Sequence, residues 1–142
     1  MTTDSLVEVR PLRRLEDDRG WFVKVIQRVH LGGRPFGEAY LAVGAAGETR
    51  GSHYHERTTE WFCPVHGCGT LYVAALDGSR RESITMDTAA PVSVRVPPGV
   101  AHALVADAGV EFSVLAVADV EYDPDDPDTF PVELKRIRGD AR

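Results

Sequence analysis

Short runs of apolar and β-branched residues, separated by turn-forming residues, dominate the hydrophobic pattern of this chain. Residues 92–96 alternate apolar and polar side chains with a period of two, as a half-buried strand does, and Pro97-Pro98-Gly99 then ends the run. Asp77-Gly78 is a hairpin signal between two further runs. No segment carries a sustained helical stripe. Strands are predicted at residues 6–9, 21–26, 39–43, 60–65, 70–76, 80–86, 92–96 and 110–117.

Strands at such spacing predict an all-β fold, an antiparallel sandwich or jelly-roll barrel with no helix longer than about two turns. Two segments fall outside this pattern. Residues 10–20 mix arginines with acidic residues and are predicted to form a loop, and residues 122–130 are predicted to form an exposed, extended acidic segment. We expect a single domain over residues 1–142, with a core at about 18–119 and an acidic tail at 120–142.

Composition narrows the class of protein. Sixteen basic and twenty-two acidic residues give a net charge of −6, which argues against nucleic acid as the partner. No apolar run reaches membrane-spanning length, and the first nine residues lack the pattern of a signal peptide. We therefore expect a cytoplasmic protein with no membrane partner. Cys63 and Cys68 are too few for a disulfide framework and are expected to be reduced.

Candidate metal ligands stand at two places in the chain. His53 and His55 are two residues apart, so on a strand both side chains point to the same face, and Glu60 follows them. His102 follows the Pro97-Pro98-Gly99 turn and is expected on a later strand. Three imidazoles and one carboxylate converging inside a barrel would make a mixed nitrogen and oxygen site for one divalent transition metal. Zinc is the first candidate, with iron, nickel or manganese as alternatives.

The spacing of these residues resembles the two motifs of the cupin superfamily. The second motif departs at both ends, where Pro91 replaces a glycine and Ala106 replaces an asparagine, but neither position supplies a metal ligand. The first motif is matched in full and the second in its middle, by Gly47, His53, His55, Glu60 and Gly67 and by Pro97, Gly99 and His102.

Flanking residues resemble the RmlC-like cupins that modify nucleotide-linked deoxysugars, and most of all the C-terminal cupin of capsule-sugar epimerases. The resemblance covers about residues 18–134 and rests on Arg50-Gly51-Ser52-His53-Tyr54-His55 and on Asp126-Pro127-Asp128-Thr129. The dehydrorhamnose epimerases of this group have glutamine at the position of His55, and the ketoisomerases have glutamine at that of Glu60. This chain keeps both ligands.

The resemblance implies an epimerase or ketoisomerase of a nucleotide-linked 4-keto-6-deoxysugar, in polysaccharide or glycoside biosynthesis. Removal of the acidic proton beside the ketone leaves an enolate, and a metal at this site would stabilise its charge. Reprotonation on the other face gives an epimer, and reprotonation at a neighbouring carbon gives a ketoisomer. The capsule enzymes also carry a reductase domain, so a separate reductase is a candidate partner.

The sequence identifies the residues that would transfer protons and bind phosphate less clearly than it identifies the candidate metal ligands. His66 shares the alternation of Glu60 and could act as base inside the cavity, or it could cap the turn at Gly67. Three tyrosines could act as acid, and Arg50 is the first choice for the diphosphate, ahead of Arg19. The candidate catalytic residues are His66, Tyr54 and Tyr72, with Tyr40 as a further tyrosine.

Two other classes of function remain open from the sequence. Cupin dioxygenases use the same three-histidine, one-glutamate ligand set for iron, and a non-catalytic cupin could bind a sugar. The sugar-type flanking motifs favour the isomerase. A jelly roll with exposed edge strands commonly dimerises to cover them, so we expect a homodimer.

Overall fold

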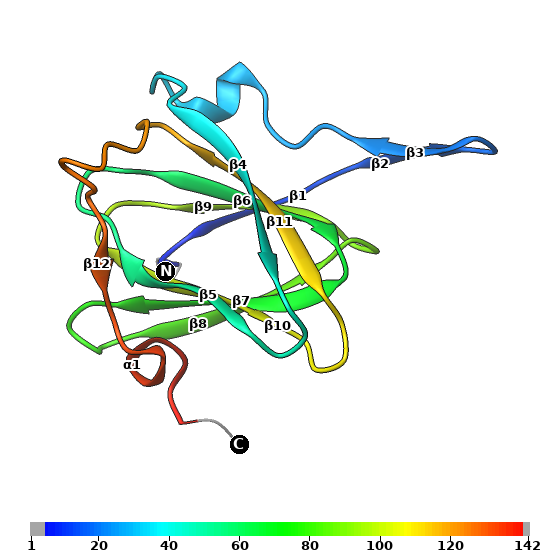
Figure 1. The fold of residues 1–142 in the computed structure, drawn as a ribbon. Coiled ribbons are helices and arrows are strands. Elements are labelled where there is room, and N and C mark those ends of the chain that lie inside the picture. Colours follow the sequence, from blue (N-terminus) through cyan, green and yellow to red (C-terminus); the bar gives the residue numbers. More distant parts are fainter. Residues whose placement is uncertain (1–4, 141–142) are drawn as a thin grey trace, which may run out of the picture.

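The computed structural model describes residues 5–140, most of which lie in antiparallel strands and the turns between them (Figure 1). Two helical segments are present in this range, a 3₁₀ turn η1 and a single-turn helix α1, and neither is long and apolar enough to cross a membrane. The elements are β1 (Glu8–Pro11), β2 (Arg14–Asp17), β3 (Gly20–Val23), η1 (Arg28–Leu31), β4 (Glu38–Gly44), β5 (Thr49–Tyr54), β6 (Glu60–His66), β7 (Cys68–Ala75), β8 (Arg81–Asp87), β9 (Val92–Val96), β10 (Val100–Ala106), β11 (Phe112–Ala118), β12 (Phe130–Pro131) and α1 (Leu134–Arg138).

Two five-stranded sheets face each other and enclose the core (Figure 1). The first sheet has the order β1-β9-β6-β11-β4 and the second the order β12-β5-β10-β7-β8. All pairings are antiparallel, and the sheets alternate along the chain as in a jelly roll. The prediction of an all-β antiparallel jelly-roll barrel is confirmed.

The inner faces of the sheets form one apolar core. Strand alternation puts Val94 and Val96 of β9 inside, and β11 contributes Val114 and Ala116 in the same way. Toward one end of the barrel this core gives way to polar residues. There the ring of Phe62 lies 5.6 Å from the ring of His102, so the apolar core forms the floor of a polar site.

Helix α1 builds a second, smaller core on the outer face of the second sheet. Its Ile137 is fully buried against Ala74, Ala101 and Ala103. These alanines leave room for the helix to approach the strands closely. The sequence pattern predicted neither α1 nor β12, because both are too short to show a period.

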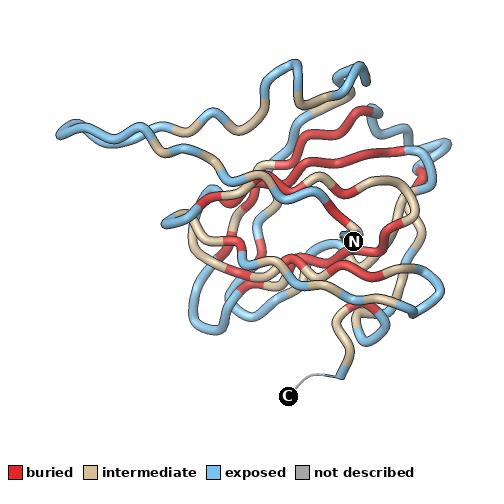
Figure 2. The backbone as a smooth tube through the Cα atoms, turned by 180° about the vertical axis from the view of Figure 1, so that it is seen from behind, coloured by how far each residue is buried: buried red, intermediate tan, exposed pale blue. Residues whose placement is uncertain are grey.

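Residues 10–20 do not form the predicted loop. Strands β2 and β3 pair there as a hairpin, which projects from the barrel (Figures 1 and 2). The guanidinium of Arg14 lies 4.2 Å from the ring centroid of Trp21, and this cation–π contact joins the two strands. The charged residues that suggested a loop are solvent-facing side chains of a thin ribbon, which also leaves Leu15, Trp21 and Phe22 exposed.

The acidic segment after β11 is not simply an exposed tail. It runs from Asp119 to Thr129 across one end of the barrel, shown in orange in Figure 1, and we call it the strap. Asp119, 5 % exposed, accepts a hydrogen bond from the backbone N–H of Thr59 at 2.8 Å and pairs with Arg34 at 2.9 Å. Asp128, also 5 % exposed, anchors the other end. The residues between the anchors are largely exposed, as predicted.

Candidate metal centre

Four metal-ligating side chains converge from three strands at the polar end of the barrel. His53 lies in β5 and His55 directly follows it, while Glu60 begins β6 and His102 lies in β10. One ligand atom from each residue lies within 4.8 Å of the others. Ligand atoms about 2.1 Å from a common ion lie up to about 4.2 Å apart, so a small contraction would bring these four to binding distance.

A β-bulge in β5 lies directly before His53 and sets the direction of its side chain. His53 pairs with His102 and Gly51 pairs with Ala103, which leaves Ser52 as an extra residue. Gly51 and Ser52 have φ of +87° and +73°, a region that glycine enters without strain. Because of the bulge, Arg50 lies on the same side of β5 as His53, opposite Leu104, although it is three residues from His53, and it is exposed. Gly51 itself is the one feature of the sequence that marks this bulge.

Hydrogen bonds orient two of the imidazoles with Nε2 toward the cluster. Nδ1 of His55 lies 2.7 Å from the carbonyl oxygen of Asp128, and Nδ1 of His102 lies 3.1 Å from that of Val100. A carbonyl oxygen only accepts, so both Nδ1 atoms carry protons and each Nε2 can offer a lone pair to a metal. Nε2 of His102 is buried and lies 3.3 Å from Glu60 Oε1, but among the described residues it has no hydrogen-bond partner of good geometry. A buried imidazole nitrogen without a hydrogen-bond partner is what a metal ion would be expected to coordinate.

Charges in the cluster are strongly coupled. Burial alone would raise the pKa of Glu60, but the imidazoles of His102 and His55 beside the carboxylate outweigh it and hold that pKa well below its usual range. Nε2 of His55 donates to Glu60 Oε1 at 2.8 Å when no metal is bound, and this bond raises the pKa of His55 although burial opposes it. Burial and the neighbouring imidazoles lower the pKa of His53 to about 4, so His53 is neutral at pH 7.

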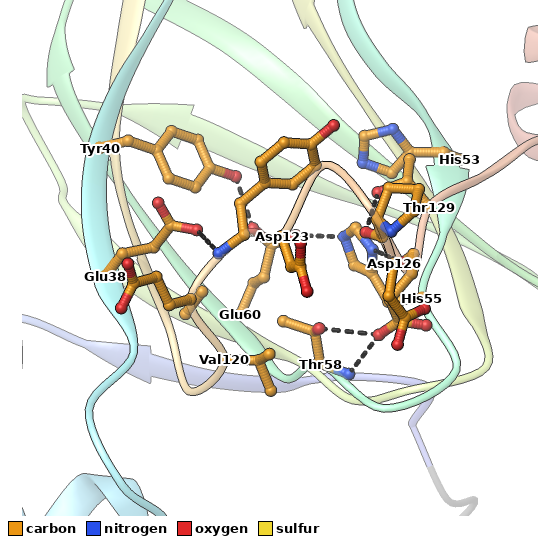
Figure 3. A pocket seen from close by; sticks show the side chains of 15 residues that line it. Glu38, Tyr40, His53, His55, Thr58, Glu60, Val120, Asp123, Asp126 and Thr129 are labelled. Carbon is orange, nitrogen blue, oxygen red and sulfur yellow. Dashed lines mark hydrogen bonds and ion pairs between the residues drawn. The ribbon is translucent and has the colours of Figure 1, made fainter.

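Tyr40 joins the cluster from the inner face of β4. Its hydroxyl donates to Oε2 of Glu60 at 2.5 Å, and Figure 3 shows Tyr40 and His55 pointing toward the same carboxylate. Burial, followed by the charge of Glu60, raises the pKa of Tyr40 far above its usual value. Tyr40 is therefore a neutral hydroxyl with its proton next to the candidate ligand set.

A cavity of about 340 Å³ opens above these residues and is walled on one side by the strap (Figure 3). Its volume is sufficient for a sugar ring. Among the described residues none of the lining side chains is lysine or arginine, while Glu38, Glu121 and Asp123 bring carboxylates to it. The cavity therefore suits a hydroxyl-rich group far better than a diphosphate.

The structure does not bring the predicted catalytic residues to this cavity. His66 is exposed at the opposite end of β6 from Glu60. Tyr54 stacks on Phe130, with ring centroids 5.1 Å apart, and packs against α1 on the outer face of the second sheet. Tyr72 lies on the same outer face, with Arg138 6.0 Å above its ring. Alternation could not place these tyrosines, because both faces of the second sheet are covered.

The two arginines predicted to hold phosphate lie far apart in the fold. Arg50 is on the inner side of β5, where its stem meets Gly44 and Leu104. Arg19 is at the tip of the projecting hairpin, largely exposed and paired with Asp17 at 2.8 Å. Of these two arginines Arg50 lies nearer the cavity, and its charge acts on the pKa of Tyr40 against the larger effect of burial.

Two known polysaccharide proteins resemble this chain over most of its length. Spore coat polysaccharide biosynthesis protein SpsL of Bacillus subtilis (strain 168) is 28% identical over 127 residues, which cover 86% of this chain and 84% of SpsL. The fold is also similar to the capsular polysaccharide assembling protein CapF of Staphylococcus aureus, with a TM-score of 0.67 and 23% identity over 87% of this chain. The match spans 35% of the CapF chain.

A second solved structure has a similar fold. ChmJ, a 3′-monoepimerase from Streptomyces bikiniensis determined with dTDP-quinovose, gives a TM-score of 0.80 at 19% identity, over 92% of this chain and 71% of ChmJ. Identity this low shows a shared fold. The family model of the polysaccharide biosynthesis C-terminal domain matches residues 15–130, which is most of the chain and includes all four candidate ligands. The chain therefore belongs to the polysaccharide biosynthesis C-terminal domain family.

Proposed function

We propose that the protein is an epimerase or ketoisomerase of a nucleotide-linked 4-keto-6-deoxysugar, dependent on one divalent metal, zinc being the first candidate. The observation that carries the proposal is Tyr40, which holds a proton against Glu60 at the edge of a three-histidine, one-glutamate cluster inside a sugar-sized cavity. Membership of a polysaccharide biosynthesis family and the likeness to a sugar epimerase support it.

His53, His55, Glu60 and His102 would hold the metal. When bound, it supplies a Lewis acid that stabilises negative charge on a sugar oxygen. The proton removed beside the ketone would pass to a carboxylate of the cavity wall, Glu38, Glu121 or Asp123, and Tyr40, kept protonated by burial and by Glu60, would donate a proton to the carbon that is reprotonated. His53 is neutral at pH 7 and makes no hydrogen bond within the described residues, so in a metal-free enzyme it would be the base.

Arg50 is our candidate for the diphosphate. The cavity itself lacks a basic side chain among the described residues, so the charged part of the substrate has to lie outside it. Arg50 faces the same interior and forms no ion pair with any residue from 5 to 140, which leaves its guanidinium free for a bidentate contact. The proposed substrate then has its sugar over the cluster and its phosphates toward Arg50. A separate reductase partner remains a prediction from the resemblance.

The test is deuterium exchange. Purified, zinc-loaded protein is mixed with UDP- and dTDP-4-keto-6-deoxysugars in D₂O, and deuterium uptake at the carbons beside the ketone is followed by NMR. We expect uptake that chelation abolishes and added metal restores. Uptake that survives exhaustive chelation would reject the metal route and leave His53 as base.

Absence of exchange across the panel would contradict the isomerase activity. Oxygen consumption by the iron-loaded protein would then identify a dioxygenase, and saturable sugar binding without turnover would identify a binding protein.

A further inference from the structure

Asp128, at the end of the strap, holds the loop that separates two of the candidate metal ligands. Its Oδ1 accepts the backbone N–H of Glu56 at 2.8 Å, and its Oδ2 accepts those of Arg57 at 3.0 Å and Thr58 at 3.1 Å. The hydroxyl of Thr58 also donates to Oδ2, at 2.8 Å. Three successive backbone donors between His55 and Glu60 are thus satisfied by one side chain.

The backbone of the same residue holds His55 itself. The carbonyl oxygen of Asp128 lies 2.7 Å from Nδ1 of His55, which fixes the imidazole with Nε2 toward the cluster. To present its carboxylate and its carbonyl to one loop, Asp128 adopts a φ of +48°, a left-handed conformation that few residues other than glycine, asparagine and aspartate adopt. Burial would raise the pKa of Asp128, but the donors of Glu56 and Thr58 outweigh it and keep the group ionised.

We propose that Asp128 is a positioning residue for the metal centre: its carboxylate fixes the loop from His55 to Glu60, and its carbonyl fixes the tautomer and orientation of His55. This rests on the metal dependence in the proposed function. Partners that orient a ligating histidine through its second nitrogen typically contribute about 10- to 100-fold to metal affinity. The strap is then part of the site, although none of its residues is among the four candidate ligands.

The test measures metal affinity without any sugar. Wild-type protein and variants are stripped of metal and titrated with Zn²⁺ against a chromophoric chelator, and Co²⁺-loaded samples are compared by visible absorption. Asp128→Ala removes the four hydrogen bonds of the carboxylate that hold the loop and the carbonyl of residue 128 in place, so His55 loses its fixed partner. Zinc should then bind about 10- to 100-fold more weakly, and the Co²⁺ spectrum should change. Asp128→Asn should fall between, because its amide oxygen can still accept from Arg57 and Thr58 while its amide N–H₂ opposes the N–H of Glu56.

The matched control is Asp126→Asn. It removes a charge from the same strap and an exposed ion pair to Arg57, at 2.9 Å, but no backbone contact to the loop. Zinc affinity should stay within about threefold of wild type. Equal weakening by the control would show an effect of net charge and overturn the proposal, as would wild-type affinity in Asp128→Ala.

If Asp128→Ala does not fold, as judged by thermal unfolding with chelator present, Asp128→Asn decides in the same way. A wild-type protein that binds no zinc also overturns the proposal. Deuterium exchange is read separately, so a protein that exchanges but binds no zinc contradicts this inference and leaves the proposed sugar chemistry intact. A protein that shows the expected zinc affinities without exchange loses only the proposed activity.

Discussion

At the scale of single residues, the two carboxylate oxygens of Glu60 face different partners, the candidate ligands on one side and the candidate proton donor on the other. One carboxylate oxygen faces His55 and His102, and the other accepts the hydroxyl of Tyr40. A buried carboxylate without such partners would be costly, so each contact contributes to keeping Glu60 ionised. Tyr40 can be tested independently of metal binding because it is not itself one of the four candidate ligands.

We predict that Tyr40→Phe lowers the rate of deuterium exchange by about 10²- to 10⁴-fold, the usual contribution of a positioned acid or base. Zinc content by elemental analysis should stay at the wild-type level, since no ligand is removed. Tyr72→Phe is the control, because its ring lies on the outer face of the second sheet. A loss of exchange in the control alone would contradict the assignment.

Stability of the metal-free protein should depend on pH in a way that the histidines set. The folded-state pKa of His55 is raised, so its stabilising contribution is complete below about pH 6.5 and is lost as pH rises through the folded pKa. The pKa of His53 is lowered to about 4, so protons bind the unfolded chain preferentially between pH 6.5 and 4, and stability falls as pH falls through this window.

Thermal unfolding with chelator should therefore give a maximum melting temperature near pH 6.5. His53→Gln should flatten the acid side of this maximum, and His55→Gln the alkaline side. The same pH profile in both variants would show that other groups control it.

At the scale of secondary-structure elements, the bulge in β5 decides where the histidines point. A Cβ on Gly51 would lie 3.3 Å from the carbonyl oxygen of His102, and the φ of +87° adds strain for any other residue. Gly78 has a similar φ of +77°, but a Cβ there would meet nothing within 4 Å. An alanine at either position would therefore have a strained backbone, but only at Gly51 would its Cβ also crowd a neighbouring strand.

Gly51→Ala is expected to lower the free energy of unfolding by about 2 to 3 kcal/mol and to weaken zinc binding, because it pushes β5 away from His102. Gly78→Ala should cost about 1 kcal/mol, from the left-handed conformation alone, and leave zinc affinity unchanged. Denaturant unfolding and the chelator competition measure the two effects. Equal losses in both variants would mean that the close approach at Gly51 is unimportant.

At the scale of the whole molecule, exposed apolar side chains gather on the outer side of the first sheet and on the projecting hairpin. Leu41 of edge strand β4 is 66% exposed, and Phe22 of β3 is 55% exposed. A two-stranded hairpin is marginal in water by itself, and the strands of this one contact each other far more than any other element. A second copy of the chain would cover both features.

We predict a homodimer, with about twice the 15.5 kDa mass of the chain by light scattering. Leu41→Asp should shift the protein toward the monomer, whereas Val110→Asp, in the turn before β11, should leave the dimer intact. A monomeric wild-type protein at micromolar concentration would contradict the prediction.

The sequence by itself determined the barrel and the identity of the four clustered side chains. Alternation in residues 92–96 and the turn at Pro97-Pro98-Gly99 report local burial and backbone restriction, which neighbouring residues encode directly. The spacing of His53 and His55 is informative for the same reason, because strand residues two apart point to the same face. Glu60 and His102 lie on other strands, and the resemblance to the cupin motifs joined them to this pair.

Only the tertiary structure decided what surrounds this cluster. Tyr40 and Tyr72 each lie in a strand with similar alternation, and which of them meets Glu60 depends on which sheet and which face each strand joins. Asp128 reaches the loop after His55 from about 70 residues away, through a strap that carries no periodic pattern. Such contacts depend on chain crossings between distant segments, and single-sequence patterns record only local periodicity and local backbone preference.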